Sequence, residues 1–209
     1  MPRTRPGTAI RKSLNIKVDT VTPTLSVAVN PASPNGTNHW YTVPVSLNAS
    51  ASDSGSGMAT IEYQLDGGTW TTGANITVSS DGSHTVLFRA IDAAGNTTLS
   101  SASSFQLDQA APGSSFLAPA SVQSATLSIS GSSSDATSGL ASAQISFDNG
   151  SSWNPLTLNA GAWSDSWDSS AQPNGNHAIS VRATDQAGNV EKGAQLSLTL
   201  DNHPPLITL

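Results

Sequence analysis

Apolar side chains fall at every second position in a series of short stretches along this chain. Residues 41–50 and 59–65 show the alternation clearly, with polar residues between the apolar ones. A period of two predicts strands that bury one face. Clusters of Gly, Asn, Asp, Ser and Pro separate the stretches and predict turns. The first half of the chain is therefore expected to form strands at 24–29, 41–50, 59–65, 76–78 and 82–92, and a last strand that ends at Leu107.

One strand and the turn after it occur twice. The segment Gly82–Asn96 recurs as Gly175–Asn189, with His, Arg, Asp, Gly and Asn at matching places 93 positions apart. Such a repeat indicates two copies of one domain. The inward positions are apolar in both copies, whereas the outward positions differ. Among the inward positions, Val86, Phe88 and Ala90 match Ile179, Val181 and Ala183; among the outward ones, Leu87 and Ile91 match Ser180 and Thr184.

The repeated turn has chemistry of its own. Asp92 and Asp185 end their strands on the inward side, where a carboxylate can accept backbone N–H bonds from a tight turn. A glycine in each turn is expected to supply a positive φ, and the asparagine after it tolerates one. On the open face, the two arginines are expected to be solvated or paired with a neighbouring strand. The predicted structural turn residues are Gly95, Asn96, Gly188 and Asn189.

A short motif occurs three times: an apolar residue, then Asp, three further residues and Pro. Its aspartates are Asp19, Asp108 and Asp201, which lie 89 and 93 residues apart. Proline fixes φ and stops strand pairing, so each motif predicts a short, stiff joint between domains. The predicted division is a basic N-terminal segment with the end of a preceding repeat at 1–18, domain 1 at 19–108, domain 2 at 109–201, and the start of a following repeat or a tail at 202–209.

Charge is sparse and unevenly placed. Five of the eight basic residues precede Asp19, and from there on three basic residues face fourteen acidic ones. This balance disfavours nucleic acid and anionic membrane as partners and is compatible with divalent cations. The chain has no cysteine, which excludes disulfides and thiol chemistry. No stretch resembles a membrane span, and the basic first residues lack the apolar core of a signal peptide.

The repeated motifs resemble a known family. IEYQLDGGTW (61–70), DGSHTVLFRAIDAAGN (81–96) and the Asp–Pro joints are similar to bacterial immunoglobulin-like repeats, and the resemblance covers nearly all of residues 19–201. It implies two tandem immunoglobulin-like antiparallel β-sandwiches, with fibronectin type III as a neighbouring possibility of the same architecture. Such repeats recur in surface adhesins and as accessory modules of secreted bacterial enzymes. The resemblance implies architecture and export more firmly than activity.

Catalysis is not expected. Ser, His and Asp are all present, but His84 and His177 occupy equivalent positions in the two copies, which indicates a structural role. No nucleophile elbow or metalloprotease motif occurs.

Calcium binding is a more specific hypothesis than catalysis, although the sequence requires no cofactor. In some tandem adhesins that these repeats resemble, calcium at the joints stiffens the array. Hard oxygen ligands suit Ca²⁺. The alternative is that the aspartates only cap turns through backbone N–H groups, and no EF-hand spacing is present. The candidate ligands are Asp19, Asp92, Asp108, Asp185 and Asp201.

Carbohydrate is the other candidate ligand. Trp163 and Trp167 lie four positions apart, on one face of a predicted strand, in a part that only domain 2 has. Their rings could stack on sugars, whereas the alternative is that they fill the core of a domain with few Phe and Tyr residues. Exposure of both rings would favour the first role, and burial would favour the second.

The favoured function is a non-catalytic spacer, stalk or adhesin repeat in a larger bacterial surface or secreted protein. Its expected partners are neighbouring repeats in the same chain and, beyond them, a host or environmental polysaccharide or surface protein. The alternative is a carbohydrate- or substrate-binding accessory domain of a secreted hydrolase. The expected location is extracellular or at the cell surface, with the signal peptide outside this fragment.

Overall fold

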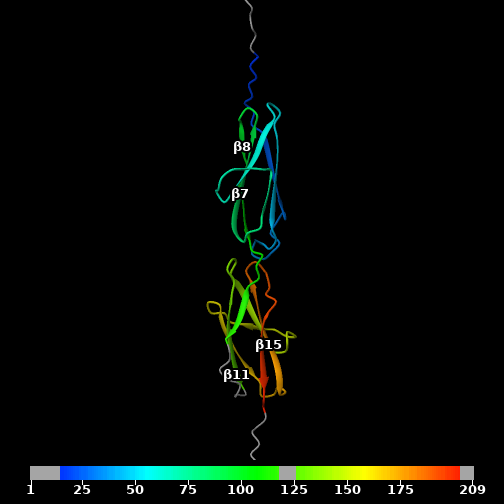
Figure 1. Cartoon of the computed structure of the whole chain (residues 1–209), viewed down its shortest axis with the longest axis vertical. Coiled ribbons are helices and arrows are strands. Elements are labelled where there is room, and N and C mark those ends of the chain that lie inside the picture. Colours follow the sequence, from blue (N-terminus) through cyan, green and yellow to red (C-terminus); the bar gives the residue numbers. More distant parts are fainter. Residues whose placement is uncertain (1–14, 118–125, 203–209) are drawn as a thin grey trace, which may run out of the picture.

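The computed structural model describes residues 15–117 and 126–202 and shows two β-sandwiches placed end to end (Figure 1). Domain 1 lies above domain 2 in this view, and one chain segment connects them. The described residues form strands and turns without any helix, so none of them forms a helix that could span a membrane. The all-β prediction is confirmed.

Domain 1 pairs a three-stranded sheet with a larger sheet. All of its strand pairs are antiparallel except β2 with β9, and the long repeated strand β7 lies at the centre of the larger sheet. The smaller sheet has the order β1 (Thr24–Asn30), β3 (Val45–Ser52), β6 (Asn75–Val78); the larger has β2 (Trp40–Tyr41), β9 (Ser103–Leu107), β7 (Gly82–Asp92), β4 (Met58–Leu65), β5 (Thr71–Thr72), with β8 (Thr97–Leu99) also on β7.

Domain 2 repeats this plan, with β15 in the place of β7. Its two sheets have three and four described strands, all antiparallel. One has the order β10 (Gly113–Leu117), β11 (Thr126–Ser134), β14 (Ala162–Asp168); the other has β13 (Asn154–Leu156), β12 (Leu140–Ser146), β15 (Gly175–Asp185), β16 (Ala194–Leu200). Two sheets packed in this way form an immunoglobulin-like sandwich.

The cores follow the period-two pattern. The inward positions of the repeated strand are fully buried in both domains, as the alternation predicted. Each core is closed by apolar side chains from both sheets. In domain 2 the buried Nε1 of Trp163 has no hydrogen-bond partner among the described residues. The buried clusters are Tyr41, Val45, Leu47, Val78, Val86, Phe88 and Leu107 in domain 1, and Leu127, Ile129, Ile145, Trp163, Trp167, Ile179, Val181, Leu198 and Leu200 in domain 2.

One strand prediction needs correction. The expected strand at 41–50 is two strands in different sheets, because Pro44 cannot donate to a ladder and the chain crosses between the sheets there. Residues 15–18, assigned to the tail of a preceding repeat, form no strand. The rest of that segment and residues 203–209 of the expected following repeat or tail lie outside the described residues.

The tryptophans of domain 2 are core residues. Trp163 is 3% exposed and Trp167 is 6% exposed. Trp163 meets the edge of Phe116 at 5.4 Å between ring centroids, and Trp167 stacks on Phe147 at 5.6 Å. They share one strand face, as predicted, but that face points inward. Burial of both rings favours the core role over the stacking platform for carbohydrate.

Trp163 packs over a glycine on the neighbouring strand. Gly131 is the register partner of Trp163, and a Cβ at Gly131 would lie 2.3 Å from the Trp163 ring and 2.1 Å from the Ser115 carbonyl oxygen. The indole needs this space, because β10 and β14 approach β11 from both sides.

Gly131→Ala is therefore expected to lower the free energy of unfolding of domain 2 by about 1–3 kcal/mol, the usual cost of overpacking. Urea unfolding followed by tryptophan fluorescence measures the change. Gly113→Ala on β10 is the matched control, since nothing lies within 4 Å of the added Cβ; its stability should stay within about 1 kcal/mol of the parent. Equal effects of the two substitutions would contradict the packing argument.

Candidate functional site

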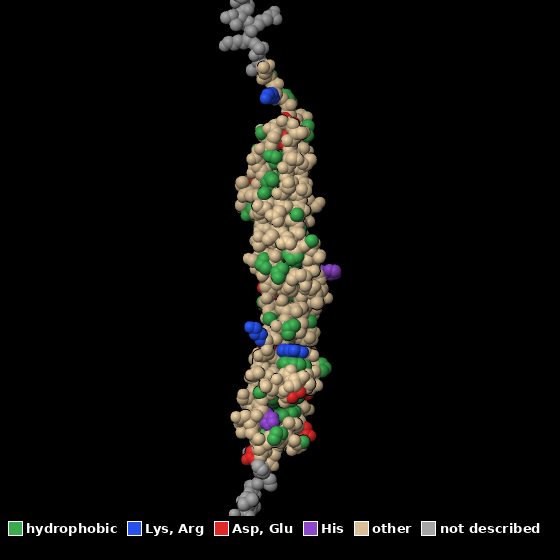
Figure 2. Space-filling model, turned by 90° about the vertical axis from the view of Figure 1, so that its right-hand side faces the viewer, with side chains coloured by type: hydrophobic (Ala, Val, Ile, Leu, Met, Phe, Trp, Pro, Cys, Tyr) green, Lys and Arg blue, Asp and Glu red, His purple; other side chains and the backbone are tan. Residues whose placement is uncertain are grey.

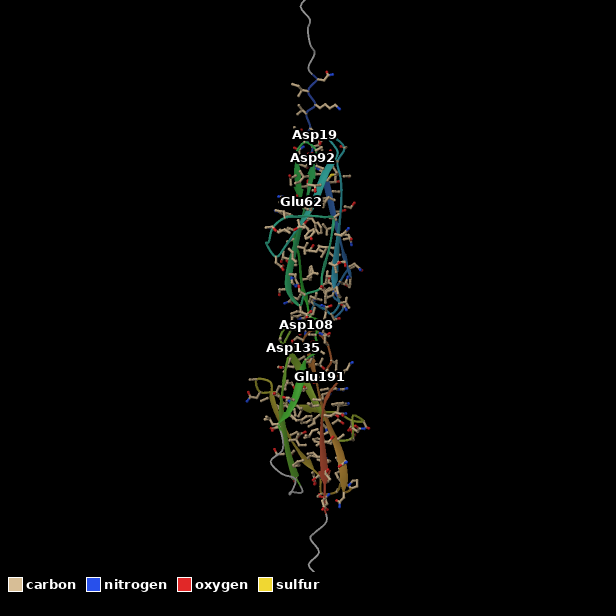
Figure 3. All side chains as sticks on the ribbon, in the orientation of Figure 1. Asp19, Glu62, Asp92, Asp108, Asp135 and Glu191 are labelled. Atoms are coloured by element: carbon tan, nitrogen blue, oxygen red, sulfur yellow. The ribbon has the colours of Figure 1, made fainter. Side chains whose placement is uncertain are left out.

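Three carboxylates meet at the N-terminal end of each domain. In each set, one ligand atom per residue can be chosen so that all three lie within 4.8 Å of one another. Figure 3 places Asp19 and Asp92 at the free end of domain 1, and Asp108 and Asp135 at the joint between the domains. The two sets are Asp19, Asp53 and Asp92, and Asp108, Asp135 and Asp185.

The first member of each set comes from the repeated turn. Asp185 is 1% exposed, and its Oδ1 accepts the N–H groups of Gly188 at 2.7 Å and Asn189 at 2.8 Å. Gly188 has a φ of 96°, which bends the chain back over the carboxylate. Asp92 accepts the N–H groups of Ala94 and Asn96 in the same way. The carboxylate therefore organises the turn, as the sequence predicted.

The second member comes from the loop after the second long strand, and sequence reasoning missed it. Asp135 Oδ1 accepts the N–H groups of Thr137 at 3.1 Å and Gly139 at 2.7 Å. Asp53 Oδ2 accepts those of Gly55 and Gly57 at 2.9 and 2.8 Å. The sequence did contain a signal for these residues, because both copies have an Asp four positions before a glycine. These segments were interpreted only as turns.

The third member is the joint aspartate. Asp108 is fully buried, and it accepts the N–H of Ala110 at Oδ1 and the N–H of Ser138 at Oδ2. Asp19 makes the equivalent bonds with Val21 and Ser56. Hydrogen bonds from the Ser56 hydroxyl, the Val21 N–H and the Ser56 N–H lower the pKa of Asp19.

An asparagine side chain ties each joint to the turn. Asn189 Nδ2 donates to the carbonyl oxygens of Asp108 at 3.0 Å and Ala110 at 3.1 Å, and to Asp185 Oδ2 at 2.9 Å. Asn96 makes the same three contacts with Asp19, Val21 and Asp92. Neither asparagine has a positive φ, so their role differs from the tolerance for αL that was expected, whereas Gly95 and Gly188 do have one.

Domain 1 also contacts the turn of domain 2 directly. The Thr37 N–H donates to the carbonyl of Ala187 at 2.8 Å, and the Thr37 hydroxyl donates to that of Gln186 at 2.7 Å. Asn38 Nδ2 lies 2.9 Å from the same Gln186 carbonyl oxygen and 3.0 Å from Gln186 Oε1. The loop before β2 is thus bonded to the turn that holds Asp185.

No described basic side chain pairs with these six carboxylates. The two ion pairs of the described residues are His84 with Asp66 and Arg89 with Glu62, both elsewhere in domain 1. Asp53 Oδ1 is buried and has no hydrogen-bond partner. Clustered carboxylate oxygens with one orphaned atom are a donor set that suits a hard cation.

The fifth predicted metal ligand does not join either set. Asp201 follows β16 at the opposite end of domain 2, where Asn174 Nδ2 lies 3.4 Å from its Oδ1. The structure therefore brings Asp19 to Asp92 and Asp108 to Asp185, each with a loop aspartate that was not predicted.

A serine, a histidine and an aspartate do meet in domain 1. His84 Nδ1 lies 2.8 Å from Asp66 Oδ2, and this bond lowers the pKa of Asp66, with the Thr85 N–H as the next cause. However, His84 Nε2 lies 2.9 Å from the Ser80 carbonyl oxygen, an acceptor, and farther from the Ser80 hydroxyl. His177 keeps the same carbonyl bond, to Pro173. A ring nitrogen that donates to a carbonyl cannot accept a serine proton. The arrangement therefore indicates that each histidine holds the loop before its strand in place.

Comparison with known proteins places the fold in a family. A model described as a bacterial Ig-like domain matches residues 120–202, and a second model of the same description matches residues 45–109. No curated protein matches the chain.

Three solved structures match the chain at low similarity. Fibronectin(III)-like modules of Clostridium thermocellum CbhA are 17% identical with a TM-score of 0.38, over 87% of this chain and 100% of that chain. A tetra-tandem repeat from the extending region of a large adhesion protein is 20% identical with a TM-score of 0.37, over 88% and 51%. A 1.5-MDa bacterial ice-binding adhesin is 21% identical with a TM-score of 0.34, over 86% and 65%. TM-scores this low give no support to a shared function.

Asn189→Ala is expected to lower the free energy of unfolding of domain 2 by about 1–3 kcal/mol, because two joint carbonyls and one carboxylate lose their donor. Urea unfolding with separate fits for the two domains measures it. Asn48→Ala, an exposed change on β3 with no side-chain bond at stake, is the control and should remain within about 0.5 kcal/mol of the parent. An Asn189→Ala protein as stable as this control would show that the amide is dispensable.

Proposed function

Because the chain consists of two bacterial Ig-like domains in tandem, we propose that it is a non-catalytic spacer. In this role it holds other parts of a larger bacterial surface or secreted protein apart. The proposed location is outside the cell or at its surface, and the proposed partners are neighbouring repeats of the same polypeptide. The end-to-end arrangement of the two domains supports an extended role (Figure 1).

The observation that carries this proposal is the bonding of Asp108. Its N–H donates to the carbonyl of Tyr41 in domain 1 at 2.9 Å. Its side chain and its carbonyl are bonded to Ser138 and Asn189 of domain 2. One buried residue is therefore fixed by both domains, and no free linker separates them at this point. A joint of this kind transmits orientation from one domain to the next.

The burial of Trp163 and Trp167 weakens the accessory-module alternative, since it removes the exposed rings on which that function depended. The spacer is the function that the described residues favour.

Joint stiffness can be measured as a distance distribution between spin labels. The chain has no cysteine, so Ser50→Cys and Ser132→Cys, both exposed, would place one label on each domain. Thr37→Ala with Asn38→Gly removes three side-chain bonds across the joint and keeps the positive φ at position 38. The parent is expected to give a narrow distribution and the double variant a broader one, with both domains still folded.

The matched control for this experiment is Asn35→Ala, which alters the same loop but removes bonds to Thr42 inside domain 1. It should leave the distribution narrow. A broad distribution in the parent protein would contradict the stiff spacer.

Calcium at the two acidic sets is part of the proposal. Asp108, Asp135 and Asp185 would hold the ion at the joint, and Asp19, Asp53 and Asp92 would hold it at the free end. The orphaned Asp53 Oδ1 and the absence of a basic partner among the described residues fit a cation. Most of the other oxygens already accept backbone N–H bonds, so the turns form without metal and the ion would neutralise the repelling charges.

If calcium binds, the difference in stability between the parent and one variant should change sign between EDTA and Ca²⁺. Asp135→Asn keeps an oxygen for Thr137 and Gly139 but removes one of three clustered charges. In EDTA it should be as stable as the parent or more stable, because repulsion falls. In 1 mM Ca²⁺ the parent should gain about 2.7 kcal/mol if the site is half-saturated near 10 µM, and the variant should gain much less.

Thermal unfolding of both proteins, in EDTA, in Ca²⁺ and in Mg²⁺ as the ion control, makes the comparison. Identical melts of the parent in EDTA and Ca²⁺ would remove calcium from the proposal and leave a spacer held by hydrogen bonds alone.

A further inference from the structure

The outer face of the larger sheet carries the same arginine–tryptophan pair in both domains. Arg89 lies over the Trp70 ring, with its guanidinium carbon 4.4 Å from the ring centroid. Arg182 lies over the Trp153 ring at 4.1 Å. Each arginine stands opposite a polar residue of the neighbouring strand, Glu62 in domain 1 and Gln144 in domain 2. The pairing itself is structural, because it is repeated.

The two copies differ in what surrounds the arginine. In domain 1, Glu62 forms an ion pair with Arg89 and neutralises it. In domain 2, the Arg182 Nε donates to the uncharged Gln144 Oε1 at 3.0 Å. Among the described residues, no ion pair and no further hydrogen bond engages the guanidinium of Arg182. The stack on Trp153 and the Gln144 bond therefore hold a planar cation in place without cancelling its charge.

The residues next to each arginine on its strand are also more polar in domain 2 than in domain 1. Leu87 and Ile91 flank Arg89 along β7, whereas Ser180 and Thr184 flank Arg182 along β15. Across the strands, Ser180 pairs with Gln195 and Thr184 pairs with Ser142. The surroundings of Arg182 on this face are thus hydroxyl and amide groups, and those of Arg89 are partly apolar.

Acidic groups near this face are engaged elsewhere. Asp148 accepts hydrogen bonds from the hydroxyl and N–H of Ser152 and from the hydroxyl of Ser146, which lower its pKa to about 2. Glu191 is bonded to Ser114 on the opposite sheet. The exposed Lys192 lies in the short segment between Glu191, whose N–H bonds to the Ala183 carbonyl, and Ala194, which pairs with Val181. Figure 2 shows few basic side chains on the visible face, and a small group of them lies over the upper part of domain 2.

We propose that the outer sheet face around Arg182 and Trp153 binds a carboxylate-bearing polysaccharide, such as one built of uronic acids. A fixed guanidinium matches a carboxylate in two parallel hydrogen bonds. The exposed Ser142 and Gln195 and the half-buried Thr184 can provide bonds to sugar hydroxyls, whereas Ser180 is buried. The apolar anchor pocket that a peptide side chain requires is not formed by these residues. From Asp19 onward the chain is strongly acidic, so within the two domains charge complementarity favours this face for an anionic ligand.

The test is calorimetric titration with a galacturonic acid hexasaccharide in low salt and EDTA, so that bridging cations make no contribution. Gln144→Glu places the carboxylate of domain 1 beside Arg182 and should weaken binding more than about tenfold. Gln106→Glu makes the same change of charge on an exposed position of domain 1 and should leave binding unchanged. Thermal unfolding confirms that both variants are folded.

Two further ligands, the methyl-esterified hexasaccharide and sulfated dextran, test whether the site recognises the carboxylate itself. Loss of binding with the ester and weaker binding of sulfated dextran would support a carboxylate site. The inference is overturned if no binding occurs, if Gln144→Glu binds as the parent does, or if the ester or sulfated dextran binds equally well. Each of these outcomes leaves the spacer intact, because the joint lies outside this face.

Discussion

In each domain, the side-chain amide of one asparagine joins the incoming chain to the turn after the repeated strand. Asn189 donates to two carbonyl oxygens of the incoming chain and to the carboxylate of Asp185. The carboxylate in turn holds the backbone N–H groups of the turn. The entry of the chain and the turn between the last two strands are therefore fixed by one connected network. In such a network, the loss of one donor leaves several acceptors unsatisfied.

This network brings negative charges together as a consequence of its own geometry. Asp108, Asp135 and Asp185 each cap a different stretch of backbone, and those stretches converge at one end of the sandwich. Each carboxylate is satisfied locally by N–H groups, while the three together repel. The outward faces differ in this respect, since Arg89 is neutralised by Glu62 and Arg182 is not. The domain ends and the face around Arg182 thus both carry charge that no ion pair among the described residues compensates.

Local patterns in the sequence predicted most of the fold and part of the site. Alternation and the repeat predicted the strands, the buried faces and the role of Asp92 and Asp185 in their turns. The loop aspartates were missed, because a turn cluster does not reveal which distant turn it will approach until the sheets pack. The inward direction of Trp163 depended on the register between β11 and β14, which places Gly131 opposite it. Burial of that face could not be inferred from the strand alone.

The position of one domain relative to the other is coupled to the stability of domain 2. Asp108 closes the last strand of domain 1 through Tyr41 and opens domain 2 through Ser138 and Asn189. Thr37 bonds to the same turn from the side of domain 1. Bending at this joint must therefore break bonds that also hold the turn of domain 2. Because the turn is part of the fold, a force that bends the joint is resisted by the stability of the domain itself. A flexible linker would provide no such resistance.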